Sequence, residues 1–108
     1  MKELIVNPSL PSGTIIVDEN TKINNFPFGI WAKSKDDKNP YVPKGLLKLI
    51  NTCVGSSMHF AFYRMDGIHG GWGNHDSLKE CLSDIRQYYT FIAPETKQEL
   101  LNLLKDNL

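Results

Sequence analysis

Residues 58–77 read MHFAFYRMDGIHGGWGNHDS and combine features that no other segment of the chain shares. The stretch holds an aromatic-rich strand candidate, four of the eight glycines and all three histidines. Its Asp66-Gly67 pair predicts a two-residue hairpin turn, because a type I′ turn requires positive φ at both central positions. We therefore expect residues 58–65 and 68–75 to pair as antiparallel strands.

Counting outward from this turn gives the hairpin a definite register. Phe62 then lies opposite Gly71, and Phe60 lies opposite Gly73. Large rings would cover bare glycine backbone, which is one way that a sheet accommodates glycine. In this interpretation the glycines serve the packing of the sheet.

The same register also predicts a ligand site. Glycines let a ligand come close to the backbone, whose N–H groups can then donate hydrogen bonds to an anion. Aromatic rings can stack on a flat ligand, Arg64 can pair with a phosphate or carboxylate, and a helix starting at Ser77 would direct its N-terminal dipole towards an anion. The candidate ligand-binding residues are Phe60, Phe62, Tyr63, Arg64, His69, Gly71, Trp72, Asn74 and Ser77.

The histidines suggest chemistry of a different class. A divalent metal could be held by His69, His75 and Asp76, with His59 or Asp66 as a further ligand. However, His69 and His75 match no standard ligand spacing and lie about 20 Å apart along an extended strand. Acid–base catalysis by the same groups lacks a neighbouring serine or cysteine in a recognised arrangement. The sequence therefore favours binding without a metal, a cofactor or catalysis.

Hydrophobic periodicity outside this stretch predicts an α+β fold. Strand patterns occupy 4–6, 14–18, 26–33 and 89–92, with 4–6 at an edge. Apolar residues at three- and four-residue spacing predict a helix over 43–54, and capping boxes predict helices over 77–87 and 94–108. Because strands and helices do not alternate regularly, we expect one α+β domain over residues 1–108. It would have a mainly antiparallel sheet of four to six strands, packed by two or three helices.

Several side chains have predicted positions within these elements. Both cysteines, Cys53 and Cys81, fall on the apolar side of a predicted helix, so we expect buried, unreactive thiols. The alternation over 26–33 places three apolar side chains on one face, namely Phe26, Phe28 and Ile30.

The last predicted helix carries more leucine than one face can bury. Its expected core face consists of Leu100, Leu101, Leu104 and Leu108. Leu103 lies off that face and would meet a partner subunit, which allows a homo-oligomer.

Composition narrows the function. Twelve basic and twelve acidic residues give a formal net charge of zero. Nucleic-acid binders usually carry a basic excess, so DNA or RNA is not expected as the main partner. No apolar run is long enough for a signal peptide or a bilayer span, so we expect a cytoplasmic protein without membrane contact.

These observations predict a small binding protein that holds an anionic or aromatic, nucleotide-like ligand at the hairpin. Two alternatives stay open. One is a protein–protein interaction module or inhibitor, in which aromatic side chains and the leucine-rich helix meet a partner. The other is a small histidine- or metal-dependent hydrolase.

Overall fold

The computed structural model describes residues 2–5, 15–16, 21–35, 38, 45–54, 57–65 and 72–107. For 2–5, 15–16, 52–54, 57–58 and 72–74 it describes the course of the backbone alone. The described strands are β1 (Lys2–Ile5), β2 (Ile15–Ile16), β3 (Trp31–Ser34), β4 (Leu46–Val54), β5 (Ser57–Arg64), β6 (Trp72–His75) and β7 (Tyr89–Ala93). The described helices are the 3-10 helix η1 (Ile23–Asn25), α1 (Leu78–Ile85) and α2 (Lys97–Asn107).

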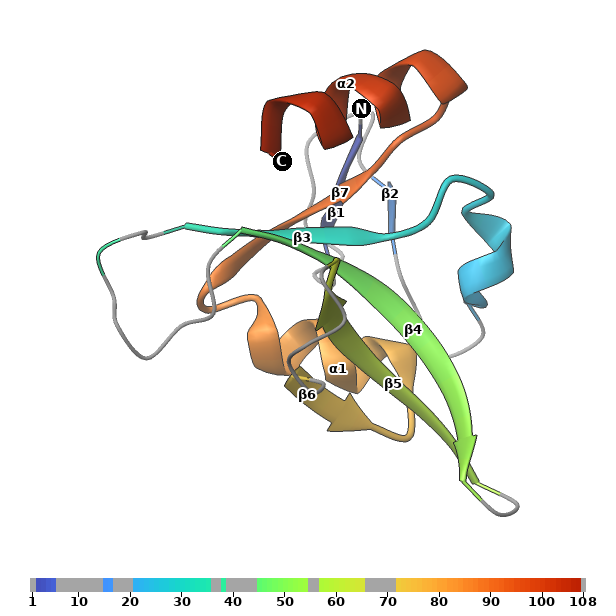
Figure 1. The fold of residues 1–108 in the computed structure, drawn as a ribbon. Helices are drawn as coiled ribbons and strands as arrows, with labels where there is room; N and C mark the ends of the chain where they lie inside the picture. The colour runs from blue at the N-terminus through green and yellow to red at the C-terminus, as the bar shows by residue number, and fades with distance from the viewer. Residues whose placement is uncertain are drawn as a thin grey trace.

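The strands form a sheet in the order β2-β1-β7-β3-β4-β5-β6 (Figure 1). Neighbouring strands are antiparallel except for β1 and β2, which run parallel. The predicted α+β class, with a mainly antiparallel sheet and two α-helices, is therefore confirmed. The sheet has seven strands among the described residues, where four to six were expected. The two-residue β2 takes the edge position that was predicted for β1.

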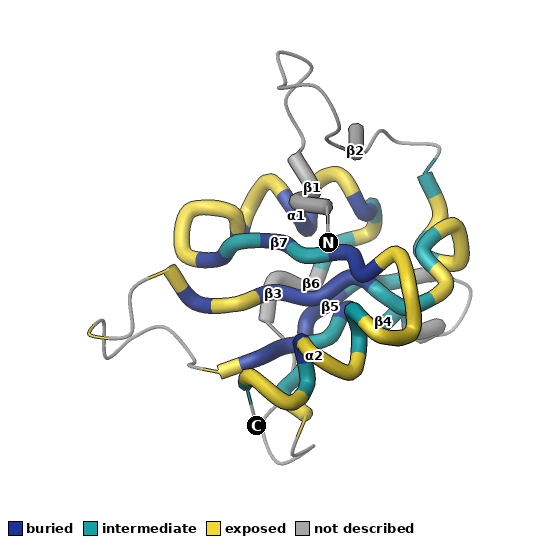
Figure 2. The backbone as a smooth tube through the Cα atoms, turned by 90° about the horizontal axis from the view of Figure 1, so that it is seen from above, coloured by how far each residue is buried: buried dark blue, intermediate teal, exposed yellow. Residues whose placement is uncertain are grey.

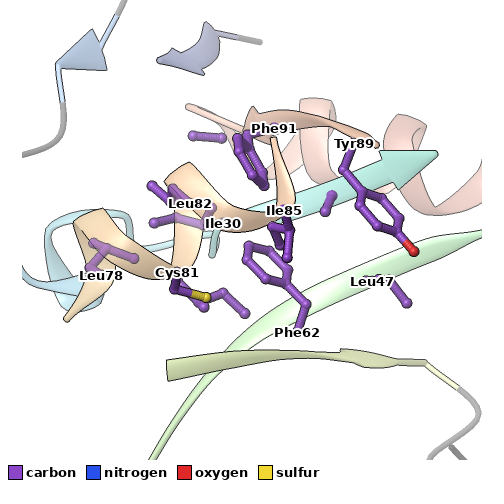
Figure 3. Close-up of a cluster of buried hydrophobic side chains, with 12 residues drawn as sticks. Ile30, Leu47, Phe62, Leu78, Cys81, Leu82, Ile85, Tyr89 and Phe91 are labelled. Atoms are coloured by element: carbon purple, nitrogen blue, oxygen red, sulfur yellow. The ribbon is translucent and has the colours of Figure 1, made fainter. Parts of the chain in front are cut away.

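The two α-helices cover opposite faces of the sheet, as Figure 1 shows with α2 above and α1 below. The larger buried cluster joins α1 to one face and contains Ile30, Ala32, Leu47, Leu49, Phe62, Leu78, Cys81, Leu82, Ile85, Tyr89, Phe91 and Ala93 (Figure 3). On the other face, Trp31 and Leu46 are buried with Leu103 of α2. Buried stretches of β3 and β4 lie alongside α2 in the view from above (Figure 2).

The predicted helix over 43–54 is wrong, because residues 46–54 form strand β4 between β3 and β5. The start of β4 is covered on both faces. Leu46 packs with α2, whereas Leu47 and Leu49 join the α1 cluster. A strand buried on both faces reads as a continuous apolar run, which periodicity alone cannot distinguish from a helix.

The predicted strand over 26–33 begins only at Trp31. The Gly29 N–H donates to the Phe26 carbonyl at 2.8 Å, which closes a turn before the strand. Gly29 has φ of +87°, a left-handed conformation that interrupts an extended chain. The expected common strand face of Phe26, Phe28 and Ile30 therefore does not form.

Helix α2 buries Leu100 and Leu104 at least partly, as predicted, but the rest of its core face differs from the prediction. Leu103 is 2% exposed, whereas Leu101 is 48% exposed. Leu100 and Leu104 pack beside Leu103, as three- and four-residue spacing on one helix face requires. Leu103 therefore belongs to the core and offers no contact to a partner subunit, and Leu108 lies outside the described residues. Neither described α-helix has the length and apolar character needed to cross a bilayer.

Candidate functional site

The two strands of the predicted hairpin pair as expected, but in a different register, and the predicted turn lies outside the described residues. Strands β5 and β6 pair antiparallel, but Phe62 lies opposite Trp72 and Phe60 lies opposite His75, with a register shift between them. The predicted pairs of rings with glycines are therefore wrong. Asp66, His69 and Gly71, which belong to the predicted turn and site, lie outside the described residues.

The aromatic members of the predicted site are separated by the sheet. Phe62 is fully buried and stacks on Phe91, with ring centroids 5.6 Å apart, so it offers no ring to a ligand (Figure 3). Phe60 is half-buried and packs against the same cluster. Tyr63 lies on the opposite face, because successive strand side chains alternate.

Among the polar members of the predicted site, Ser77 has a structural role that the structure describes. The Ser77 hydroxyl accepts a hydrogen bond from the Glu80 N–H at 3.1 Å and caps α1, as the capping box predicts. Arg64 lies on the α1 side of β5, where its charge acts on Tyr89. Burial raises the pKa of Tyr89 to about 12, against the lowering effect of Arg64. For Asn74, as for Trp72, the structure describes the backbone in β6. The described residues thus do not gather the predicted set into one pocket.

Two histidines form pairs with carboxylates around β6. His59 Nδ1 lies 3.2 Å from Asp76 Oδ1, and His75 Nε2 lies 2.9 Å from Asp84 Oδ2. The two pairs lie on opposite faces of the sheet. His75 is opposite Phe60 and shares its α1 side, whereas His59 precedes Phe60 in β5 and therefore points to the other face. They link β6 to β5 and to α1. In the part of the chain that the structure describes, no three ligating side chains gather as a metal site would need.

The cysteines lie in different elements. Cys81 is fully buried in α1, and its burial, reinforced by the nearby Asp84 carboxylate, raises the pKa of the thiol to about 12. The thiol therefore stays protonated near neutral pH and is a core side chain rather than a nucleophile, as expected. Cys53 belongs to β4 and not to a helix.

The sequence did not predict a pocket of about 330 Å³ that lies beside the start of β3. We call it the Trp31 pocket. Residues 23–31 form much of its wall, and β4 and α2 supply the remainder. Its lining includes Phe26, Phe28, Trp31, Lys48, Leu49 and Leu100.

Local geometry fixes the wall of the Trp31 pocket. The Trp31 indole N–H donates to the Phe28 carbonyl at 2.8 Å, and the Lys48 ammonium lies 5.4 Å from the centre of the Trp31 ring. A Cβ atom at Gly29 would lie 3.1 Å from the indole nitrogen and 3.4 Å from Lys48 Cε. Glycine at this position therefore provides both the left-handed turn and the space that the two side chains occupy.

The Trp31 pocket has a simple electrostatic character. Lys48 is half-buried and is the one charged residue among the described residues that line it. A cation near an aromatic face gains about 0.5–2 kcal/mol from the ring quadrupole, depending on how far it is desolvated. The ring orders the ammonium without neutralising its charge, so the pocket carries one positive charge.

A second hollow of about 450 Å³ shares Phe26 and Pro27 with the Trp31 pocket. Its remaining lining includes Thr21, Asn25 and the acidic Glu95. With one aromatic ring and a carboxylate, this hollow suits a polar group. The Trp31 pocket has the lining that is typical of a small-molecule site, which is mainly apolar with few polar groups.

A turn signal could have indicated this pocket from the sequence. Pro27 and Gly29 stand between two phenylalanines and a tryptophan, and Pro and Gly commonly interrupt regular structure. Comparisons with protein-family models, with curated proteins and with solved structures found no match for the chain. A fold alone does not specify a function, so the chemistry of the pocket carries the functional inference.

Proposed function

We propose that this chain is a binding protein that holds a small aromatic ligand in the Trp31 pocket without turning it over. The supporting observation is the pocket lining, which brings Phe26, Phe28 and Trp31 together with one ammonium group. A volume of about 330 Å³ lies at the lower end of the range for small-molecule sites, which favours a small ligand. The proposal keeps the ligand class predicted from the sequence and moves its site from the hairpin to residues 23–31.

The absence of catalysis in this proposal follows from the side chains of the pocket. Its described lining contains no histidine, cysteine, serine or carboxylate, so it offers no second acid–base group to work with Lys48. Within this proposal we keep a cytoplasmic setting as the sequence-based expectation. The interaction-module alternative has less support, because the exposed large apolar side chains among the described residues, Met65, Tyr88 and Leu101, stand on three different segments.

The two tryptophans provide a direct test of the proposal. In a ¹H–¹⁵N spectrum, Trp31 and Trp72 each give an indole N–H signal, and a Trp72→Phe variant assigns them. We expect neutral aromatic fragments such as phenylacetamide and indole, at millimolar concentrations, to shift the Trp31 signal saturably.

A matched pair of variants makes this test specific to the pocket. Phe28→Ala removes one ring from the wall and should weaken fragment binding several-fold. Tyr88→Ala removes an exposed ring elsewhere and should leave binding unchanged. The proposal fails if no aromatic fragment shifts the Trp31 signal, or if Phe28→Ala and Tyr88→Ala bind equally well.

A further inference from the structure

Lys48 has an unusual position for a lysine. It lies on β4 directly across from Trp31 on one side and Tyr63 on the other, so aromatic residues flank it in the sheet. Its side chain is half-buried, and its ammonium lies 5.4 Å from the centre of the Trp31 ring. Among the residues that the structure describes, no carboxylate forms an ion pair with Lys48.

An ammonium in this position attracts an anion more strongly than an exposed lysine would. Partial burial removes water from the charge, and charges interact more strongly where water is excluded. The Trp31 ring supports the ammonium from one side but leaves N–H donors for another partner. No acidic side chain of the described lining competes for them.

The charge and size of the pocket together restrict the ligand. One lysine matches one negative charge, whereas phosphate groups are typically held by arginine forks or by several donors. Three aromatic side chains and a volume of about 330 Å³ suit a single substituted ring. We infer that the ligand is an aromatic monocarboxylate whose carboxylate pairs with Lys48. This inference rests on the proposed function, because it names the ligand class of the same pocket.

Four fragments that share a benzene ring test this inference at pH 7. Phenylacetate is a monoanion, phenylacetamide is neutral, phenethylamine is a cation and phenyl phosphate carries more than one charge. Binding is followed at the Trp31 indole signal. We expect phenylacetate to bind about tenfold more tightly than phenylacetamide, and phenethylamine to bind most weakly. Added salt should weaken the binding of phenylacetate but not that of phenylacetamide.

Three variants assign the preference for an anion to Lys48. Lys48→Met keeps an unbranched side chain without the charge and should remove the difference between phenylacetate and phenylacetamide. Lys48→Arg keeps the charge and should retain most of the preference. Lys33→Met is the control, because Lys33 is exposed on the same face of neighbouring β3. Unchanged amide binding by Lys48→Met would show that its pocket is intact.

The outcomes separate this inference from the proposed function. Equal binding of phenylacetate and phenylacetamide, or an unchanged preference in Lys48→Met, would overturn the inference while the pocket still bound rings. Tighter binding of phenyl phosphate than of phenylacetate would overturn the inference that the ligand carries a single negative charge. If no fragment shifts the Trp31 signal, the proposed function fails, and the inference fails with it.

Discussion

The rings of Phe62 and Phe91 stack at 5.6 Å between their centroids, with an interplanar angle of 25°. Phe62 belongs to β5 and Phe91 to β7, and β3 and β4 lie between these strands in the sheet. The stack therefore joins two strands that do not pair, within the buried cluster that also contains the apolar side chains of α1 (Figure 3). A residue predicted to bind a ligand thus serves to hold the sheet and helix together.

Truncation of Phe62 should destabilise the protein strongly. Phe62→Ala removes a fully buried ring and leaves a cavity, which typically costs about 3–5 kcal/mol. Phe60→Ala is the matched control, because Phe60 is only half-buried against the same cluster, and its loss should be clearly smaller. Urea unfolding followed by circular dichroism measures both. Equal losses for the two variants would contradict the central position of Phe62.

Local signals predicted the elements whose ends are fixed by their own residues. Ser77 and Glu80 specify the start of α1 through a hydrogen bond that spans three residues. The apolar stripe of α1 is buried as its spacing predicts, with Leu78, Cys81, Leu82 and Ile85 all in the core. Such local hydrogen bonds, and burial of one helix face, can be predicted from the sequence because the residues that produce them are close together in the chain.

Contacts between segments that are distant in the chain determine two features that were not predicted, strand β4 and the Trp31 pocket. The start of β4 is buried on two faces, because Leu46 packs with α2 whereas Leu47 and Leu49 pack in the α1 cluster, and no local pattern shows this. The β-branched Ile50, Thr52 and Val54 alternate along this segment and were the available strand signal. The Trp31 pocket depends on the pairing of β3 with β4, which sets Trp31 opposite Lys48, and on the space that Gly29 leaves beside both side chains. No local pattern shows this pairing.

The two helix caps should contribute independently to stability. The Thr96 hydroxyl accepts from the Glu99 N–H at 3.1 Å, just as Ser77 accepts from Glu80 at the start of α1. Ser77→Ala and Thr96→Ala should each cost about 1 kcal/mol. Because the caps belong to different helices and share no partner, the double variant should lose about 2 kcal/mol. Ser77→Asp should retain the cap, and a loss equal to that of Ser77→Ala would contradict the capping role.

Alkaline pH should destabilise the folded chain through two buried groups. Burial raises the pKa of Cys81 from 9.0 to about 12 and that of Tyr89 from 10.0 to about 12. At a pH between the ordinary and the raised pKa of each group, the group is deprotonated in the unfolded chain but still protonated in the folded chain. The free energy of unfolding should therefore fall as pH rises from about 9 to 12, and these groups should not affect its pH dependence below about pH 8.

Single substitutions separate the two contributions to this alkaline loss. Cys81→Ala should flatten the pH dependence from about pH 9 upwards, and Tyr89→Phe should flatten it from about pH 10. Urea unfolding at several pH values gives the slope, which a uniform loss of stability does not alter. An unchanged slope in both variants would show that these groups titrate normally in the folded state.

The His75–Asp84 pair should hold β6 locally and contribute little to global stability. The two side chains lie 2.9 Å apart but are 30% and 53% exposed, and such pairs typically contribute about 0–1 kcal/mol. Asp84→Asn should therefore leave the urea midpoint nearly unchanged and accelerate amide hydrogen exchange in β6. Ser83→Ala, at an exposed neighbouring position of α1, is the control. Unaltered amide hydrogen exchange in β6 would mean that the His75–Asp84 pair does not stabilise this strand.

Gly29 should be more sensitive to substitution than Gly45, although both have positive φ. Their φ values are +87° and +92°, so Gly29→Ala and Gly45→Ala should carry a similar backbone cost of about 1–2 kcal/mol. A Cβ atom at Gly45 meets nothing within 4 Å, whereas one at Gly29 lies 3.1 Å from Trp31 Nε1. The extra loss in Gly29→Ala therefore measures the contact with the pocket wall.

The Trp31 indole signal reports the same contact independently. Gly29→Ala should shift this signal, because the added methyl group presses on the indole nitrogen that donates to Phe28. It should also weaken aromatic fragment binding, whereas Gly45→Ala should change neither the signal nor the binding. Equal destabilisation by the two substitutions, with an unmoved Trp31 signal in both, would contradict a close fit between Gly29 and the wall. The stability measurement alone cannot reveal this fit, since backbone strain acts at both glycines, so the indole signal is the deciding observation.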